Sequence, residues 1–404
     1  MQPLFSLRPV ELYTIAFLGS SAIYLVFAFW LKKTMISRLS LRTLLTAGIL
    51  VRIVLVPLTP VGSDDIYRYI WDGKVQSAGI NPYQYAPDAP ELAGLHTAEL
   101  PALVNHSSMK TVYFPLTQWA FWLGYQMAGE HPWGIKLLLL AAELGTLLLL
   151  VNLLRWNGVP EKYVLLYALC PLPILMFALD GHIDALGLPV FLLALLFWIR
   201  ERKVTSLLLF GISMSVKPVA LVVLPLLFFR EKGLSGRLRV VLLPFVLVAL
   251  QFLPYVFSAN PLESIARFGV HWAFNGALFE VIYMVVANNQ LARLVCAILL
   301  ATGVVALAVR RKDALTGTYT AIFLLLLLSP VVHPWYVSWL AVLLPLVRRW
   351  SGILLAATVS LSSLTVMNYR LTGDWSQHPW VLVLEYVPVL AAGLYELLNS
   401  PEPV

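Results

Sequence analysis

The chain is dominated by apolar runs of about 20 residues, separated by shorter polar stretches. A run of this length crosses the hydrocarbon core of a bilayer as a helix, and inside lipid only helices and closed barrels satisfy every backbone polar group. Barrel strands would alternate polar and apolar residues over about ten positions, and the sequence lacks that alternation. The runs therefore predict an all-α, polytopic membrane protein.

The composition agrees with this prediction. Of 404 residues, 60% are hydrophobic and 12% are charged, whereas a soluble domain is about half apolar and a quarter charged. The net charge of +7 does not indicate a nucleic-acid partner, because most Lys and Arg lie in short clusters at the ends of apolar runs. Membrane lipids are the expected surroundings. The two cysteines, Cys170 and Cys296, lie within apolar runs and indicate neither a disulfide framework nor a metal site.

The basic clusters also predict the orientation of the chain. Residues 32–42 carry four bases and no acid, which is typical of a cytoplasmic loop, whereas residues 61–133 carry seven acids against three bases. We predict a single bundle domain over residues 1–404 with about 11–13 spans, an extracytoplasmic N-terminus and a cytoplasmic C-terminus. Full spans are expected at about 12–31, 43–60, 134–155, 162–179, 238–257, 290–309, 318–332, 335–347, 351–368 and 380–397, with one more ending at Arg200.

Segment 204–229 fits this scheme least well. Basic clusters flank it on both sides, and Lys217-Pro218 interrupts its apolar run. Proline removes a backbone donor and breaks or kinks a helix. Two half-helices forming a hairpin fit the charge pattern better than one crossing, although the crossing stays open.

The first long polar passage, residues 61–133, is the predicted catalytic loop. Its first part, residues 62–87, places Asp64, Asp65 and Asp72 among tyrosines and a tryptophan, directly after an apolar run. Residues 114–128 are apolar but short and aromatic, which is typical of an interfacial helix.

Helical spacing separates the acids of this loop. Asp64 and Arg68 are four apart and could form an ion pair, whereas Asp65 and Asp72 fall on another face together with Tyr69. Asp65 is therefore the unneutralised carboxylate, and an apolar interface would raise its pKa toward that of a general base.

Two other interpretations of these acids remain open. Ser63 is a good helix N-cap, so Asp64 and Asp65 could simply occupy a first turn, where the helix dipole favours negative charge. A metal site from Asp64, Asp65 and Asp72 is also conceivable, but no further acidic cluster completes the coordination.

Several motifs in this order resemble a known family. Asp-Asp-Ile-Tyr-Arg-Tyr at 64–69, followed by Asp-Gly at 72–73 and Gly-Ile-Asn-Pro-Tyr at 79–83, is similar to the first extracytoplasmic loop of polyprenol-phosphate-dependent glycosyltransferases of the GT-C superfamily, bacterial α-mannosyltransferases above all. The resemblance continues at 181–186, 216–218 and 333–336, although Ile183 stands where the family usually has Asn.

The resemblance implies an inverting, metal-independent transfer of a hexose, with mannose as the expected sugar, and no cofactor besides the polyprenyl-phosphate-linked donor. The acceptor would be a lipid or glycan on the extracytoplasmic side of the bacterial cytoplasmic membrane. Asp65 matches the acid of the family's Asp-x-Tyr-x-Tyr pattern and would be the general base, with Asp64 as the second choice.

Candidate substrate-binding residues come from five places in the sequence, and plainer explanations exist for them. They are Arg68, Tyr69 and Asp72 in the loop, His182 and Asp184 in a polar stretch, Lys217 inside an apolar run, His271 in the polar and aromatic stretch 258–289, and His333, Trp335 and Tyr336 at a span end. The plainer explanations are a polar turn for His182 and Asp184, an interfacial helix for His271, and an aromatic belt around His333. Lys217 would bind the donor phosphate or pair with Glu143.

Two rival functions use the same residues differently. A transporter or flippase of a lipid-linked sugar would place ionisable groups and broken helices at mid-membrane, paired between two halves of the chain. Only Lys217 and Glu143 fit that pattern, and no internal repeat is seen. A non-catalytic scaffold is the third reading.

Overall fold

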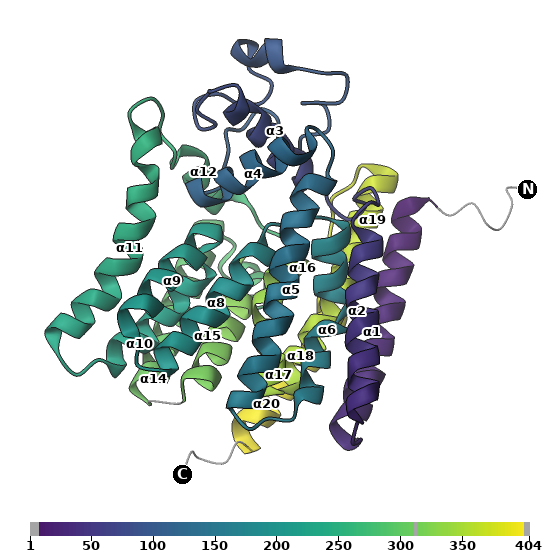
Figure 1. Cartoon of the computed structure of the whole chain (residues 1–404), viewed down its shortest axis with the longest axis vertical. Coiled ribbons are helices and arrows are strands. Elements are labelled where there is room, and N and C mark those ends of the chain that lie inside the picture. Colours follow the sequence, from purple (N-terminus) through teal and green to yellow (C-terminus); the bar gives the residue numbers. More distant parts are fainter. Residues whose placement is uncertain (1–7, 311–312, 400–404) are drawn as a thin grey trace, which may run out of the picture. The chain divides into compact units, whose positions relative to one another are not determined.

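The structure, a computed structural model, describes residues 8–310 and 313–399; the side chains of Phe268 and His271 also lie outside the described residues. Within these ranges every regular element is a helix, and an isolated bridge pairs Phe274 with Val331 (Figure 1). The prediction of an all-α fold is confirmed.

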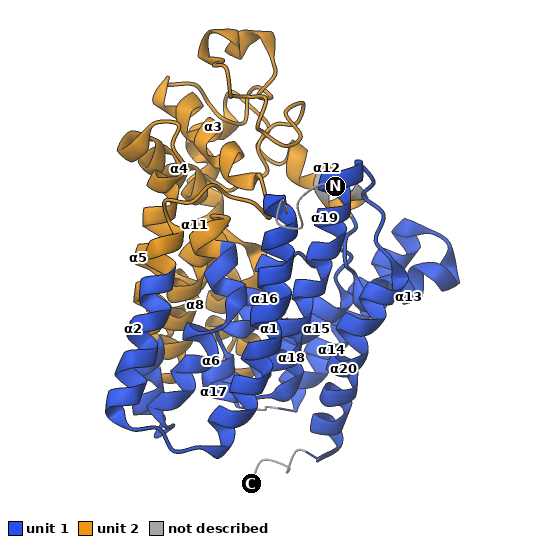
Figure 2. Ribbon diagram, turned by 90° about the vertical axis from the view of Figure 1, so that its right-hand side faces the viewer, with its two compact units in different colours: residues 1–51, 150–176, 273–404 blue, residues 52–149, 177–272 orange. Residues whose placement is uncertain are grey.

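The chain forms two compact units made of interleaved segments (Figure 2). Unit 1 consists of Met1–Val51, Leu150–Met176 and Ala273–Val404, and unit 2 consists of Arg52–Leu149 and Phe177–Trp272. Each unit therefore combines stretches that are far apart in the sequence. The prediction of one enzyme domain over residues 1–404 stays a prediction.

Unit 1 is built mainly from long apolar helices. In it, α1 packs against α18 and α19, α18 packs against α20, and α14 packs against α15. Its elements are α1 (Pro9–Lys33), most of α2 (Arg38–Leu55), η2 (Glu161–Val164), α6 (Leu165–Ala168), α7 (Pro171–Pro173), the start of η3 (Ile174–Leu179), α13 (Ala277–Val286), α14 (Asn289–Val309), α15 (Ala314–Leu328), α16 (Pro334–Ala341), α17 (Leu344–Val347), α18 (Trp350–Thr358), η5 (Val359–Ser362), α19 (Ser363–Thr372) and α20 (Pro379–Asn399).

Unit 2 carries the predicted catalytic loop above a helical bundle. Its helices α8, α9 and α11 pack side by side, and α3 packs against α4. Its elements are α3 (Asp65–Ser77), η1 (Pro90–Leu95), α4 (Pro115–Ala128), most of α5 (Trp133–Trp156), α8 (Asp184–Ile199), α9 (Lys203–Val216), η4 (Pro218–Val223), α10 (Leu224–Arg230), α11 (Leu234–Val256) and α12 (Glu263–His271).

Six helical segments of the described chain are long and apolar enough to cross a membrane, or seven if the bent segment 161–179 counts as one span. They are α1, α5, α11, α14, α18 with α19, and α20. The other predicted spans fall on shorter or less apolar helices. Proline interrupts some of them: the helix axis bends by 48° between Ala168 and Pro171. The polytopic membrane fold is confirmed, and the predicted span count exceeds the number of long helices.

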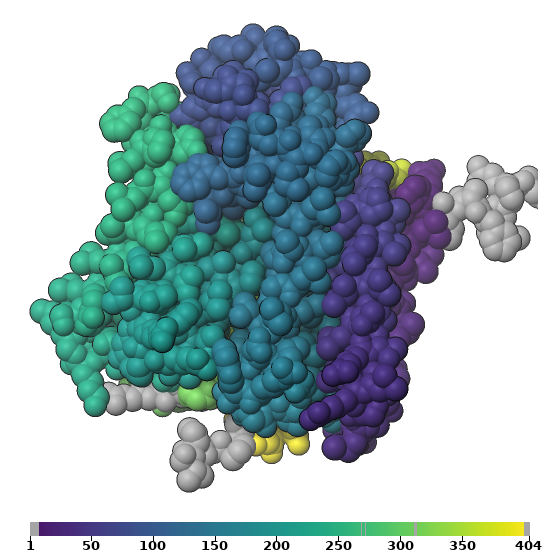
Figure 3. Space-filling model, viewed as in Figure 1, coloured from purple at the N-terminus to yellow at the C-terminus, as the bar shows by residue number. Residues whose placement is uncertain are grey.

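The lipid-facing character of these helices is clearest on α11. Its outward side chains are apolar and about half exposed, among them Leu242 at 52% and Leu250 at 57% (Figure 3, green at the left). Its inner face approaches α9 closely at Gly211, where an added Cβ would lie 3.0 Å from the carbonyl oxygen of Pro244. A side chain at this position would therefore force the two helices slightly apart.

Segment 204–229 forms the expected pair of half-helices. Helix α9 ends at Val216, Lys217 is extended with φ −155°, and η4 begins at Pro218. The side chain of Lys203, at the start of α9, lies 2.7 Å from that of Glu231, directly after α10. Because the two ends of the segment meet, it turns back on itself, and the hairpin prediction agrees with the structure.

Candidate active site

Helix α3 begins at Asp65 and carries the predicted base in its first turn. The hydroxyl of Ser63 accepts a hydrogen bond from the Asp65 amide at 3.2 Å, and Asp64 is the cap residue outside the helix. The other end of α3 packs tightly on α4 because Gly73 has no side chain; an added Cβ would collide with the carbonyl of Phe121. Helix α3 is therefore capped at its start and packed closely on α4 near its end.

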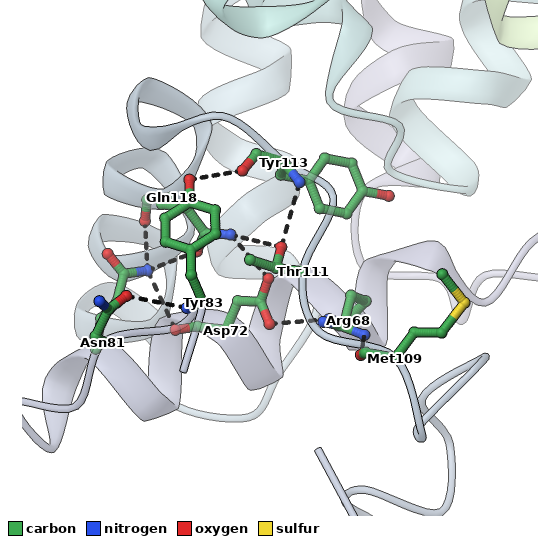
Figure 4. A network of polar contacts seen from close by, with 9 residues as sticks. Arg68, Asp72, Asn81, Tyr83, Met109, Thr111, Tyr113 and Gln118 are labelled. Atoms are coloured by element: carbon green, nitrogen blue, oxygen red, sulfur yellow. Dashed lines mark hydrogen bonds and ion pairs between the residues drawn. The ribbon is translucent and has the colours of Figure 1, made fainter. Parts of the chain in front are cut away.

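Arg68 belongs to a buried network between α3, α4 and residues 109–113 (Figure 4). Its Nε lies 2.9 Å from Asp72 Oδ1, and its Nη1 donates to the carbonyl of Met109 at 2.8 Å. Gln118 of α4 donates to the other oxygen of Asp72 at 2.9 Å. We predicted Asp64 as the ion-pair partner of Arg68, and this was wrong. Asp64 precedes the helix, and Arg68 pairs instead with Asp72, four residues further along α3.

The turn before α8 is fixed to the residues before α3. Asp180 Oδ1 accepts hydrogen bonds from the amides of Val61 and Gly62 at 3.0 and 2.8 Å. Gly181 has φ +78°, and its Cα faces the side chain of Ile66 so closely that a Cβ would collide with it. The turn places His182, which is fully buried, with Nδ1 3.6 Å from Asp65 Oδ2.

The Asp65 carboxylate is partly shielded, with its side chain 21% exposed. Its Oδ1 accepts a hydrogen bond from Asn105 Nδ2 at 2.7 Å. Desolvation raises the pKa of Asp65 to about 6; the negative charges of Asp64 and Asp184 add to this rise, while Asn105 and the positive charge of Lys217 oppose it. A carboxyl with this pKa is mostly ionised at neutral pH and accepts a proton more readily than an ordinary aspartate.

Lys217 and Asp184 form an ion pair beside this carboxylate. Lys217 Nζ lies 3.1 Å from Asp184 Oδ2; the lysine side chain is 21% exposed, and that of Asp184 is 1% exposed. The alternative partner that we considered for Lys217, Glu143, is paired with Arg52 at 3.0 Å in the buried interior of unit 2. Lys217 therefore presents a partly accessible cation next to Asp65.

His333 and its neighbours lie in unit 1, at the start of α16. The imidazole of His333 stacks on Trp335 with 4.3 Å between ring centroids and on Phe274 with 4.9 Å, and Tyr336 meets it edge-on. The bridge between Phe274 and Val331 holds this aromatic group together. The substrate contacts predicted for His333, Trp335 and Tyr336 stay predictions.

Comparison with known proteins decides the family. Residues 3–230 match the model of the alpha-(1->6)-mannopyranosyltransferase family, N-terminal domain, and residues 267–398 match the MptB C-terminal domain. The chain belongs to the alpha-(1->6)-mannopyranosyltransferase family. Alpha-(1->6)-mannopyranosyltransferase A of Mycobacterium tuberculosis (strain ATCC 25618 / H37Rv) is 24% identical over 394 residues, which cover 85% of this chain and 72% of the relative. No solved structure matches the chain significantly.

This family membership makes the chain a membrane-embedded glycosyltransferase of the mannosyltransferase kind and agrees with the predicted resemblance to the GT-C superfamily. Of the predicted site residues of this mannosyltransferase, unit 2 brings Asp65, His182, Asp184 and Lys217 together. Arg68, Tyr69 and Asp72 lie at the α3–α4 contact and are at most 6% exposed. Their substrate contacts stay predictions, as does that of His271, whose side chain lies outside the described residues.

Two residues at the site of the mannosyltransferase were missed. Asn105 lies in an irregular polar stretch 40 residues after Asp65, where no periodicity indicates a contact. Asp180 directly precedes the Gly-His-Ile-Asp stretch that we had singled out, and this adjacency was the only available signal. Its role is in the backbone hydrogen bonds that fix the turn.

Proposed function

We propose that this enzyme transfers mannose from a β-linked polyprenyl-phosphate donor to a lipid or glycan acceptor on the extracytoplasmic side of the bacterial cytoplasmic membrane. Asp65 acts as the general base, with Asp64 as the second choice. The observation that carries the proposal is the first turn of α3, where a carboxyl with a pKa of about 6 lies beside the Lys217–Asp184 pair.

The proposed step balances as an inverting displacement. Asp65 takes the proton of the acceptor hydroxyl, the acceptor oxygen forms a bond with the anomeric carbon, and the bond from that carbon to the phosphate oxygen breaks. Polyprenyl phosphate leaves with the bonding electrons. The relative's name specifies an α linkage, and inversion to an α product requires a β-linked donor.

Lys217 supports the donor assignment. A cation positioned where negative charge develops on a leaving group stabilises the transition state. Its side chain lies beside Asp184 and is 21% exposed, so the ammonium group is partly accessible to a phosphate. In an apolar site, a lysine needs a negative partner, and both the buried carboxylate of Asp184 and the donor phosphate would provide one.

The assay that tests this function uses isolated membranes and a panel of polyprenyl-phosphate sugars, with mass analysis of the product. We expect transfer from the β-linked mannosyl donor. Asp65→Asn should lower transfer by about 10²–10⁴-fold at pH values where the wild-type Asp65 is ionised, because the amide cannot accept the proton and general-base catalysis supplies a factor of about this size. The matched control is Asp88→Asn, which neutralises an exposed carboxylate of the same loop.

The wild-type rate should also fall below about pH 6, as Asp65 becomes protonated. Near wild-type turnover by Asp65→Asn would overturn the base assignment. Transfer from other donors but not from a polyprenyl-phosphate sugar would overturn the donor class.

A further inference from the structure

We infer that Asn105 is a positioning residue that holds the Asp65 carboxylate so that Oδ2 is the proton-accepting atom. The inference rests on the proposed role of Asp65. Asn105 Nδ2 donates to Oδ1 at 2.7 Å, a short and therefore strong contact for a charged acceptor. Because one oxygen is engaged by the amide, the other oxygen remains to take the proton.

The backbone around Asn105 is fixed at several points, so its side chain has a defined place. The carbonyl of Met109 accepts from Arg68 at 2.8 Å, and Lys110 pairs with Glu263 of α12 at 2.9 Å. The carbonyl of Ser107 accepts from the amide of Asp88 at 3.3 Å. We call residues 104–110 the strap. It ties α3, α12 and the loop after Tyr85 to one another within unit 2.

His182 lies near the other oxygen of the carboxylate. Its Nδ1 lies 3.6 Å from Oδ2, and its ring is fully buried. The amide of Asn105 therefore fixes Oδ1, whereas Oδ2 lies near the imidazole at a distance beyond hydrogen-bond range. A base must keep its accepting atom within hydrogen-bond reach of the proton, so this restraint on rotation aids catalysis.

Asn105 also affects the acidity of the base. The charged and titratable groups around Asp65 are Asp64 and Asp184, which raise its pKa, Lys217, which lowers it, and His182. The hydrogen bond from Asn105 stabilises the ionised carboxylate and therefore lowers the pKa as well. Removing this donor should raise the pKa, so that a higher pH is needed to ionise the base.

The test is the pH dependence of kcat/KM for Asn105→Ala and Asn105→Asp in membranes. We expect the acid limb of Asn105→Ala to move up by about one pH unit, since a hydrogen bond to a charged group shifts pKa by about that much. Asn105→Asp keeps the shape of the side chain but replaces a donor with a like charge, so its limb should move further. Ser107→Ala in the same strap is the matched control and should leave the limb in place.

The outcomes separate this inference from the proposed function. If Asp65→Asn is inactive and the limb moves in both Asn105 variants, the inference is supported. If Asp65→Asn is inactive but the acid limb of Asn105→Asp stays where it is in the wild type, Asn105 does not position Asp65 or affect its pKa. The inference then fails, while the proposed function stands. If Asp65→Asn is active, the proposed function fails first. Should Asn105→Ala not accumulate, the isosteric Asn105→Asp variant decides.

Discussion

Two carboxylates of the candidate site, Asp65 and Asp184, have different partners. Asp184 is buried and paired with the cation of Lys217, whereas Asp65 accepts a hydrogen bond from the neutral amide of Asn105 and lies 3.6 Å from the ring of His182. A pair of acids in different environments is a common way to divide tasks within one site. Asp184 pairs with the lysine, and in the proposed mechanism Asp65 accepts the proton of the acceptor hydroxyl.

The role of Lys217 can be separated from its contribution to stability. Lys217→Met should lower the amount of folded protein, because leaving a buried carboxylate unpaired costs about 3–5 kcal/mol. The double variant Lys217→Met/Asp184→Asn should recover folded protein but not transfer, because the cation for the donor phosphate is missing. Asp184→Asn alone is the control. Rapid transfer by the double variant would exclude Lys217 from phosphate binding.

At the scale of single residues, the sequence predicted what depends on local spacing. A helix beginning at residues 63–65 was predicted, and α3 begins at Asp65, but the choice of Asp65 as the base also used an Asp64–Arg68 pair, which the structure replaces with Arg68–Asp72. The partner of Arg68 was wrong because the exact first residue of a helix decides which acid lies within four positions. Asn105 could not be predicted, since its contact with Asp65 closes an irregular loop of 40 residues.

The contact between α3 and α4 depends on Gly73. Because a Cβ at this position would meet the backbone of Phe121, Gly73→Ala should separate the two helices and cost about 1–3 kcal/mol. The melting temperature of the purified protein should fall, and transfer should fall with it because α3 carries the base. Gly145→Ala, on α5 where nothing lies within 4 Å, should be neutral or slightly stabilising. Equal melting temperatures for the two variants would contradict this packing argument.

At the scale of elements, long uninterrupted apolar runs and the break at Lys217-Pro218 were predictable, whereas the breaks within 162–179 and 335–347 were not. The predicted spans 12–31, 134–155 and 290–309 correspond to α1, α5 and α14 within three residues at each end. The predicted span 335–347 is divided into α16 and α17, and 162–179 is bent. Hydrophobicity alone does not show where a proline breaks a helix. The outcome also depends on the protein contacts around that helix.

The topology of the whole chain predicts which positions face each side of the membrane. Ala98→Cys, in an exposed part of the loop, should react with an impermeant maleimide in intact cells. Ser37→Cys, Arg202→Cys and Lys232→Cys should react only after permeabilisation, because these positions adjoin basic clusters and the 203–231 hairpin returns to its starting side. The native Cys170 and Cys296 are buried and should stay silent.

Either of two labelling results would contradict this topology. Reaction of Arg202→Cys and Lys232→Cys from opposite sides would mean that the segment crosses the membrane. Reaction of Ala98→Cys only after permeabilisation would invert the chain and place Asp65 on the cytoplasmic side.

The interleaving of the two units has a consequence for biosynthesis. The amides of Val61 and Gly62 are held by Asp180, which is 119 residues after Val61 in the chain. The segment carrying Asp65 is therefore synthesised well before Asp180, before His182 and before Lys217, which follows α9. Domains form as the chain emerges from the ribosome, at about 5–20 residues per second. A chain interrupted before residue 180 thus carries the proposed base on a segment that Asp180 does not yet hold.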